Sequence, residues 1–294
     1  DLNINVDNTF WLAGKAMFLE GTSPYSPEVT LQSQVGIYGR PAAAGEDQVA
    51  FAYPPFSLLP ILPTLWMTFD WAYAFWLALN TVGFLTLLFF LFRPASRSLS
   101  PTAILFYPVF ICLITGNFSV MIAGALLLFF GLATRPGNFS ATAQVFTAIG
   151  LAWAAAKPQF IWLFSIFILL YAVKQRLHVF LGAYFVSLAG LLAISFAYAP
   201  GWVAEWVERI QMYAGYVNSR PVISELLGVF LPGQPALFLG GAILTACGGL
   251  TVWLFYRWWQ GKLNWLSVLA WTGLVTYLSH LHGIAYEQMT FLAP

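Results

Sequence analysis

The feature that most constrains this chain is a series of apolar runs with few charged residues between them. The run from Trp71 to Phe92 contains no charged residue, and as a helix it is long enough to cross a hydrocarbon core of ~30 Å. Only 8% of the residues are charged, whereas an ordinary soluble domain has roughly 25%. We therefore predict an all-α, polytopic integral membrane protein. The further apolar runs are 102–115, 120–134, 141–156, 158–173, 177–199, 223–232, 234–256 and 263–279.

Several of these runs are too short to cross a bilayer. Helices of roughly 13–16 residues reach only ~20–24 Å, so we expect helices that end below one membrane surface and line a polar cavity. The run from Tyr53 to Met67 contains Pro60 and Pro63, which predicts a short, broken or re-entrant helix. In all we expect about eight or nine membrane segments.

We expect one transmembrane domain over residues 1–294. Within residues 1–50, the stretch from Phe10 to Leu19 has apolar residues at helical spacing, which predicts an outer loop with an amphipathic surface helix. Residues 51–294 form the predicted helical membrane core. The chain begins without Met and ends as a new apolar run begins, so we expect a fragment that lacks a flanking span at each end.

The distribution of charge predicts the orientation. If the chain leaves the outer side at Asp70 and turns at each break, seven of the 12 basic residues lie on one side, which the positive-inside rule identifies as cytoplasmic. All 11 acidic residues then lie on the opposite side. The long segments 1–50 and 199–222 lie there too, and the second predicts an interfacial helix. We therefore expect the working face on the non-cytoplasmic side. The seven basic residues are Arg93, Arg97, Arg135, Lys174, Arg176, Arg257 and Lys262.

Two polar breaks on the predicted outer side are candidates for binding a phosphate. Lys157 interrupts an apolar run and Pro158 breaks the helix after it, so its ammonium is available to an anion such as a lipid phosphate. A snorkelling lysine at a helix end is the alternative interpretation. Asn117 follows Gly116 at another break, and the helix N-terminus after it suits a phosphate or a sugar hydroxyl. A plain tight turn is the alternative there.

The end of the chain carries His280 and His282, followed by Tyr286 and Glu287. Two histidines two residues apart point to different faces of a helix, so we predict no metal site. One of them is a candidate hydrogen-bond donor to a phosphate or sugar, and a structural interfacial histidine is the alternative. Glu287, with Tyr286 beside it, is a candidate second base or acceptor contact, or a partner of Arg220; a solvated charge is the alternative.

Asp7 is the best candidate for a general base. A carboxylate on an outer loop, partly desolvated by Phe10 and Trp11, can take a proton from an attacking hydroxyl. Cys112 and Cys247 both lie in apolar runs and are expected to be core residues. The sequence contains no Walker loop, zinc-helix motif or nucleophile elbow, and no basic stripe interleaved with aromatics. We therefore expect no cofactor and no nucleic-acid partner.

Four short motifs occur in a particular order along the chain. The first comprises Asp7, Phe10-Trp11-Leu12-Ala13-Gly14 and Gly21-Thr22-Ser23-Pro24-Tyr25, and the others are Tyr53-Pro54-Pro55, Gly116-Asn117 and Ala156-Lys157-Pro158. In this order they resemble glycosyltransferase family 87. Members of that family are similar to the mycobacterial polyprenyl-phosphate-mannose-dependent mannosyltransferases and adopt the GT-C fold.

The resemblance implies a GT-C-like bundle, a polyprenyl-phosphate sugar donor, inversion at the anomeric carbon, an outer-loop Asp as base and a histidine that contacts the donor. Carried over, the base is Asp7 and the histidine is His280 or His282. Because Asp7 lies one residue closer to the aromatic pair than in the usual pattern, Asp1 is the second candidate for the base.

We therefore expect a glycosyltransferase that moves a sugar, mannose first, to a lipid-linked or glycan acceptor. The expected location is a bacterial plasma membrane, with the active site on the outer side and membrane lipids as neighbours. A membrane transporter or lipid flippase is the alternative, since such a protein also uses broken helices and a charge within the membrane.

Overall fold

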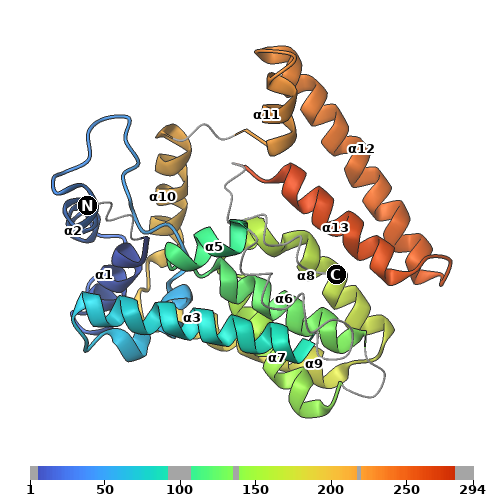
Figure 1. Cartoon of the computed structure of the whole chain (residues 1–294), viewed down its shortest axis with the longest axis horizontal. Helices are drawn as coiled ribbons and strands as arrows, with labels where there is room; N and C mark the ends of the chain where they lie inside the picture. The colour runs from blue at the N-terminus through green and yellow to red at the C-terminus, as the bar shows by residue number, and fades with distance from the viewer. Residues whose placement is uncertain (1–5, 92–106, 135–138, 217–219, 282–294) are drawn as a thin grey trace. The chain divides into compact units, whose positions relative to one another are not determined.

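The computed structural model describes residues 6–91, 107–134, 139–216 and 220–281 (Figure 1). Within these ranges the regular secondary structure is helical and there is no β-strand, which confirms the predicted all-α fold. Three described helices hold a stretch long and apolar enough to cross a membrane, namely α3 (Phe69–Leu91), α9 (His178–Tyr198) and α12 (Gln234–Trp259). Between 11% and 22% of each stretch is buried, so most of its apolar side chains face outward, as contact with lipid requires.

The remaining apolar runs form shorter helices, as predicted. They are α5 (Tyr107–Ile114), α6 (Ser119–Ala133), α7 (Ala141–Ala154), α8 (Pro158–Lys174), α11 (Val222–Gly228) and α13 (Trp265–Ser279). The proline-containing run forms η1 (Pro55–Thr64), a 3₁₀ helix. Pro60 and Pro63 lack the N–H donors that a continuous α-helix needs, so the predicted short, broken helix is confirmed.

Residues 6–50, as the structure describes them, contain two helices instead of one. The first, α1 (Val6–Phe18), covers the predicted amphipathic stretch, and the second, α2 (Pro27–Tyr38), lies where the sequence predicts only loop. The ends of α2 have local causes: the Ser26 side chain accepts from the Val29 N–H, and Gly39 ends the helix with φ 68°. A helix is present within 199–222, as predicted, namely α10 (Trp202–Tyr216); its position at a membrane interface stays a prediction.

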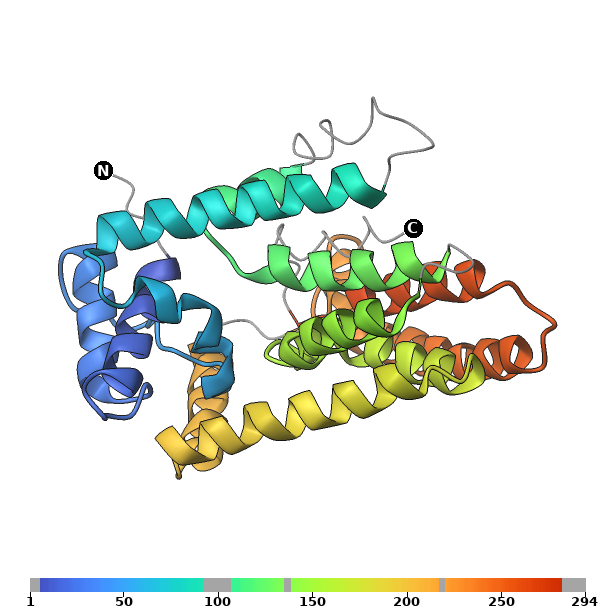
Figure 2. The same ribbon diagram turned by 90° about the horizontal axis from the view of Figure 1, so that it is seen from below.

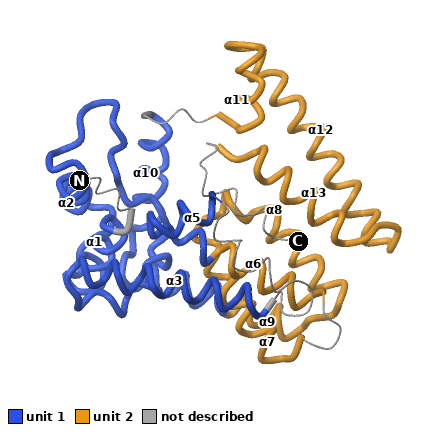
Figure 3. Tube along the Cα trace, viewed as in Figure 1, with its two compact units in different colours: residues 1–121, 187–218 blue, residues 122–186, 219–294 orange. Residues whose placement is uncertain are grey.

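The chain divides into two compact units, coloured separately in Figure 3. The first comprises residues 1–121 and 187–218, and the second comprises residues 122–186 and 219–294. Because α6 and α9 each run from one unit into the other, neither unit is a continuous piece of chain; Figure 2 shows α9 as one long helix. The expectation of a single transmembrane domain over 1–294 stays a prediction.

An aromatic core fills the second unit. The side chains of Phe129, Phe130, Phe164, Phe167 and Phe180 are all fully buried. Their rings meet at centroid distances such as 5.3 Å for Phe129 and Phe180 and 6.5 Å for Phe130 and Phe167. Large rigid rings of this kind fix how α6, α8 and α9 lie against one another.

Candidate functional site

Three of the four sequence motifs meet in an aromatic cluster of the first unit. The Phe10 ring lies 5.1 Å from the Tyr53 ring and 4.9 Å from the Phe118 ring, and Tyr53 and Phe118 are 5.1 Å apart. Phe10 belongs to the first motif and Tyr53 to the second, while Phe118 directly follows Gly116-Asn117. Segments more than 100 residues apart in sequence are therefore held together by ring contacts, each worth about 0.5–1.5 kcal/mol beyond burial.

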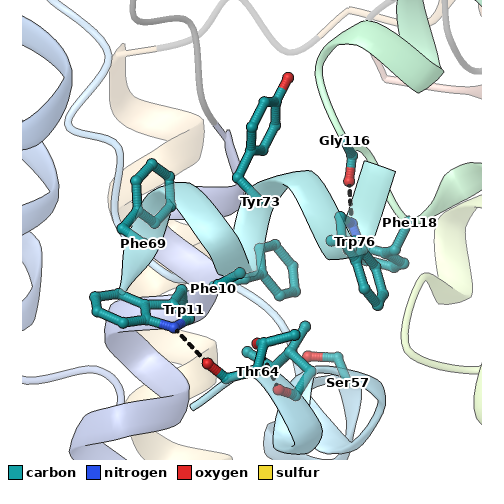
Figure 4. A pocket seen from close by; sticks show the side chains of 11 residues that line it. Phe10, Trp11, Ser57, Thr64, Phe69, Tyr73, Trp76, Gly116 and Phe118 are labelled. Atoms are coloured by element: carbon teal, nitrogen blue, oxygen red, sulfur yellow. Dashed lines mark hydrogen bonds between the residues drawn. The ribbon is translucent and has the colours of Figure 1, made fainter. Parts of the chain in front are cut away.

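A small, partly open cavity adjoins this cluster (Figure 4). The Trp11 Nε1–H donates to the Thr64 carbonyl at 3.2 Å, and the Trp76 Nε1–H donates to the Gly116 carbonyl at 2.7 Å, so both indole rings are fixed. The buried Ser57 hydroxyl has no hydrogen-bond partner among the described residues. The aromatic residues that line the cavity are Phe10, Trp11, Phe69, Tyr73, Trp76 and Phe118.

Asp7 lies in the first turn of α1, one turn before the two residues that line this cavity. The position of this turn is set by tight neighbours. The Thr9 hydroxyl donates to the Val49 carbonyl at 3.4 Å, and Gly36 of α2 approaches the Asn8 side chain so closely that an added Cβ would lie 1.9 Å from Asn8 Nδ2. The candidate base therefore sits on a helix end that α2 and the 46–50 segment hold in place.

The Gly-x-x-Pro-Tyr part of the first motif is anchored by α10. Ser23 hydrogen-bonds to the Glu205 carboxylate, and the Arg209 guanidinium donates to the Tyr25 carbonyl. The Tyr25 hydroxyl donates to the Tyr53 carbonyl at 2.6 Å. Burial, and then the negative charge of Glu205, raise the pKa of Tyr25, so its hydroxyl stays protonated and able to donate.

Asn117 joins two helices. Gly116 has φ 62° and the Asn117 N–H donates to the Cys112 carbonyl at 2.9 Å, which ends α5 in a Schellman turn. The Asn117 Oδ1 then accepts from the Ser119 N–H at 2.9 Å, which caps the start of α6. Asn117 is 2% exposed, and its side-chain oxygen is used in this cap. The predicted contact of Asn117 with the donor phosphate stays a prediction.

In the second unit, Lys157 and His280 lie at the same end of a helix pair. The Tyr171 ring near the end of α8 lies 5.7 Å from the Trp265 ring at the start of α13. Midway along, a Cβ on Gly273 would lie 3.5 Å from Phe164 Cζ. The two helices are therefore antiparallel. Lys157 is seven residues before Phe164 and His280 is seven residues after Gly273, so the register puts both residues at the same end of the helix pair.

Both residues are buried at helix ends. Lys157 is 1% exposed and immediately precedes α8, and His280 is 7% exposed and immediately follows α13. The His280 Nδ1 lies 3.2 Å from the Leu281 carbonyl; because a carbonyl only accepts, this contact favours a hydrogen on Nδ1. Both side chains therefore carry nitrogen atoms into the protein interior at the same end of the helix pair.

A comparison with protein families assigns the chain. The family model of glycosyltransferase family 87 matches residues 51–280. The chain belongs to glycosyltransferase family 87. The match includes Asn117 and Lys157 and ends at His280, whereas Asp7 precedes it. Neither a search of curated proteins nor a search of solved structures found a match.

Family 87 membership makes this protein a glycosyltransferase, with a sugar donor and an acceptor as its substrates. Of the residues predicted to serve the reaction, Lys157 and His280 lie at the same end of the α8–α13 pair in the second unit. Asp7 and Asn117 belong to the first unit. Asp1, His282, Tyr286 and Glu287 lie outside the described residues.

Arg220 lies near His280 in the backbone, although the sequence predicted it only as a partner of Glu287. Pro221 and Leu281 form an antiparallel bridge, and the Val222 N–H donates to the His280 carbonyl at 2.9 Å. This bridge carries the backbone of Arg220 to the segment that holds His280. No local signal marks the contact, because the two segments are about 60 residues apart in sequence.

Proposed function

We propose that this protein transfers a sugar from a polyprenyl-phosphate donor to a lipid-linked or glycan acceptor, on the non-cytoplasmic face of a bacterial plasma membrane. Mannose is the sugar that we propose. The observation that carries the proposal is that Lys157 and His280, both buried, lie at the same end of the antiparallel α8–α13 pair. A membrane-embedded glycosyltransferase that releases a lipid phosphate needs fixed positive charge of this kind.

The reaction is a single displacement. The oxygen of the acceptor hydroxyl attacks the anomeric carbon of the donor sugar, and the bond from that carbon to the phosphate oxygen breaks with its electron pair. Asp7 takes the proton from the hydroxyl as the new bond forms. Because the attack comes from the face opposite the leaving group, the configuration at the anomeric carbon inverts. Asp1 is the alternative base.

Lys157 and His280 act on the leaving phosphate. Negative charge develops on the phosphate oxygen as the glycosidic bond breaks, and a fixed ammonium and imidazole stabilise that charge more strongly in a buried site than in water. Asn117 and His282 remain candidates for further donor contacts, and Tyr286 and Glu287 for acceptor contacts or a second base. A transporter or flippase would transfer no sugar from any of the donors, with or without the Asp7 carboxylate.

The test is sugar transfer by membranes that contain the full-length protein, with radiolabelled polyprenyl-phosphate mannose, glucose and arabinose as donors. We expect transfer with mannose and a loss of at least ~100-fold in Asp7→Asn, the size expected for removal of a general base. Asp70→Asn is the matched control, because Asp70 is an exposed carboxylate in the first turn of α3. It should retain full activity.

Two results would overturn the proposal. Transfer by Asp7→Asn at the wild-type rate would remove Asp7 as the base and direct attention to Asp1. No transfer with any of the three donors, by protein that is folded in detergent, would favour the transporter or flippase.

A further inference from the structure

Two helices of the second unit end in the same backbone turn but with different residues. At the end of α12, Gly261 has φ 76° and the Lys262 N–H donates to the Arg257 carbonyl at 3.0 Å. At the end of α8, Arg176 has φ 56° and the Leu177 N–H donates to the Ala172 carbonyl at 2.8 Å. Glycine adopts this left-handed conformation without strain, whereas an arginine does not. Arg176 is thus held in a strained conformation where glycine would relieve the strain.

These two helix ends lie side by side. The Lys174 ammonium donates to the Trp258 carbonyl and lies 4.5 Å from the centre of the Trp258 ring. The Tyr171 ring stacks on the same indole at 6.2 Å. The last turn of α8 is therefore docked on the last turn of α12. Four basic residues lie at these two helix ends, which we call the basic end: Lys174, Arg176, Arg257 and Lys262.

The basic end has no acidic residue in its own segments. The sequence contains no Asp or Glu in residues 122–186 or in residues 226–281. Arg257 lies 5.4 Å from the Trp253 ring, and its buried Nε has no hydrogen-bond partner among the described residues. Like charges gathered without carboxylates repel one another, so this surface favours an anion from outside the unit.

The surroundings identify the kind of anion. Tyr256 and Trp259 are 59% and 45% exposed, and exposed aromatic rings at the end of an apolar helix are typical of a membrane–water interface. An open recess adjoins the basic end; Gln175 and Leu177, which flank Arg176 in the sequence, line it together with Asn264. Clusters of basic residues at the end of a membrane helix bind anionic lipid head groups.

We propose that the basic end binds the phosphate head group of an anionic membrane phospholipid, with Arg176 and Lys262 as its exposed contacts and the acyl chains along the apolar surface of α12. The strain at Arg176 is then explained, because a glycine there would form the turn but would not bind the phosphate. The inference does not depend on the proposed sugar transfer.

The test uses the full-length protein in nanodiscs of phosphatidylcholine with a minor fraction of phosphatidylglycerol, and native mass spectrometry to count the bound lipids. We expect Arg176→Gly and Lys262→Gln each to lower the preference for phosphatidylglycerol about fivefold. In discs of phosphatidylcholine alone, Arg176→Gly should melt at or above the wild-type temperature, because it relieves the backbone strain. Arg40→Gln, an exposed cation of the first unit, is the control and should leave the preference unchanged.

An unchanged preference in the Arg176→Gly, Lys262→Gln double variant would overturn the proposal. An equal loss in Arg40→Gln would overturn it too, because the effect would then follow from net charge and not from the basic end. A lower melting temperature of Arg176→Gly without anionic lipid would show that the Arg176 side chain serves the fold.

Discussion

Lys157 is 1% exposed, and a buried ammonium is expensive unless an anion or several hydrogen bonds accompany it. The helix that follows Lys157 begins at Pro158. Because proline has no N–H, the helix start has one fewer N–H group that needs an acceptor. His280, at the same end of the α8–α13 pair, is 7% exposed. At the scale of single residues, the proposed function depends on this pair.

If Lys157 and His280 act on one leaving phosphate, their effects on catalysis are coupled. We expect Lys157→Gln and His280→Gln each to lower kcat about 10²–10³-fold, and the double variant to lose much less than the product of the two. The measurement is the rate of transfer from polyprenyl-phosphate mannose at saturating donor, with Arg40→Gln as the control. Independent, multiplicative losses would show that the two side chains serve different steps.

A second prediction concerns the exposed ion pair of Glu46 and Arg40. The Arg40 guanidinium donates two hydrogen bonds to the Glu46 carboxylate, with N–O distances of 2.8 and 2.9 Å. The hydrogen bonds from Arg40 and from the Ala43 N–H lower the pKa of Glu46 from 4.5 to about 2. A lowered pKa means that the pair stabilises the loop fully above about pH 4.5, and that this contribution is lost as the pH falls toward 2.

The measurement for Glu46 is a carbon-13 titration of its carboxyl group in the detergent-solubilised protein. We expect a midpoint near the lowered value in the wild type and a return toward 4.5 in Arg40→Gln. A wild-type midpoint at the ordinary value would mean that the pair does not form in solution.

At the scale of elements, one close contact joins α11 to α12. A Cβ on Gly240 would lie 2.2 Å from Ser224 Oγ and 3.2 Å from its Cα, so the two helices meet nearly backbone to backbone. This contact lies close to the candidate site, because Pro221, just before α11, forms the bridge to Leu281 beside His280. The next residue, Gly241, has open space within 4 Å.

We therefore expect Gly240→Ala to destabilise the protein by about 1–3 kcal/mol, because the methyl group forces α11 away from α12. Gly241→Ala should be neutral, or stabilising by up to about 1 kcal/mol, because alanine is the better helix former. Thermal unfolding in detergent measures both. Equal melting temperatures for the two neighbouring variants would contradict the predicted contact.

At the scale of the whole molecule, the charge distribution predicts which segments face the cytoplasm. Arg40 belongs to the segment predicted on the outer side and Lys262 to the opposite side, and both are exposed. In a Cys112→Ala, Cys247→Ala background, we expect Arg40→Cys to react with a membrane-impermeant maleimide in intact cells. Lys262→Cys should react only after the cells are permeabilised. Labelling of Lys262→Cys in intact cells would reverse the predicted orientation.

The sequence by itself determined the membrane class, the short helices and the family. Apolar runs, prolines and charges act locally, so they can be interpreted without knowing which helices touch. The order of the four motifs is likewise a property of the chain alone. The helix α2 was missed although Ser26, Pro27 and Gly39 mark its ends, because its apolar residues follow no clear helical period.

Only the tertiary structure decided which of these residues meet. The contact of Phe10 with Tyr53 and Phe118, the register that puts Lys157 and His280 at the same end of the α8–α13 pair, and the bridge that brings Arg220 to the His280 segment all join residues far apart in sequence. The strained Arg176 is also visible only in the folded backbone. Such contacts depend on how side chains of different helices fill the space between them, and short-range patterns carry no information about that fit.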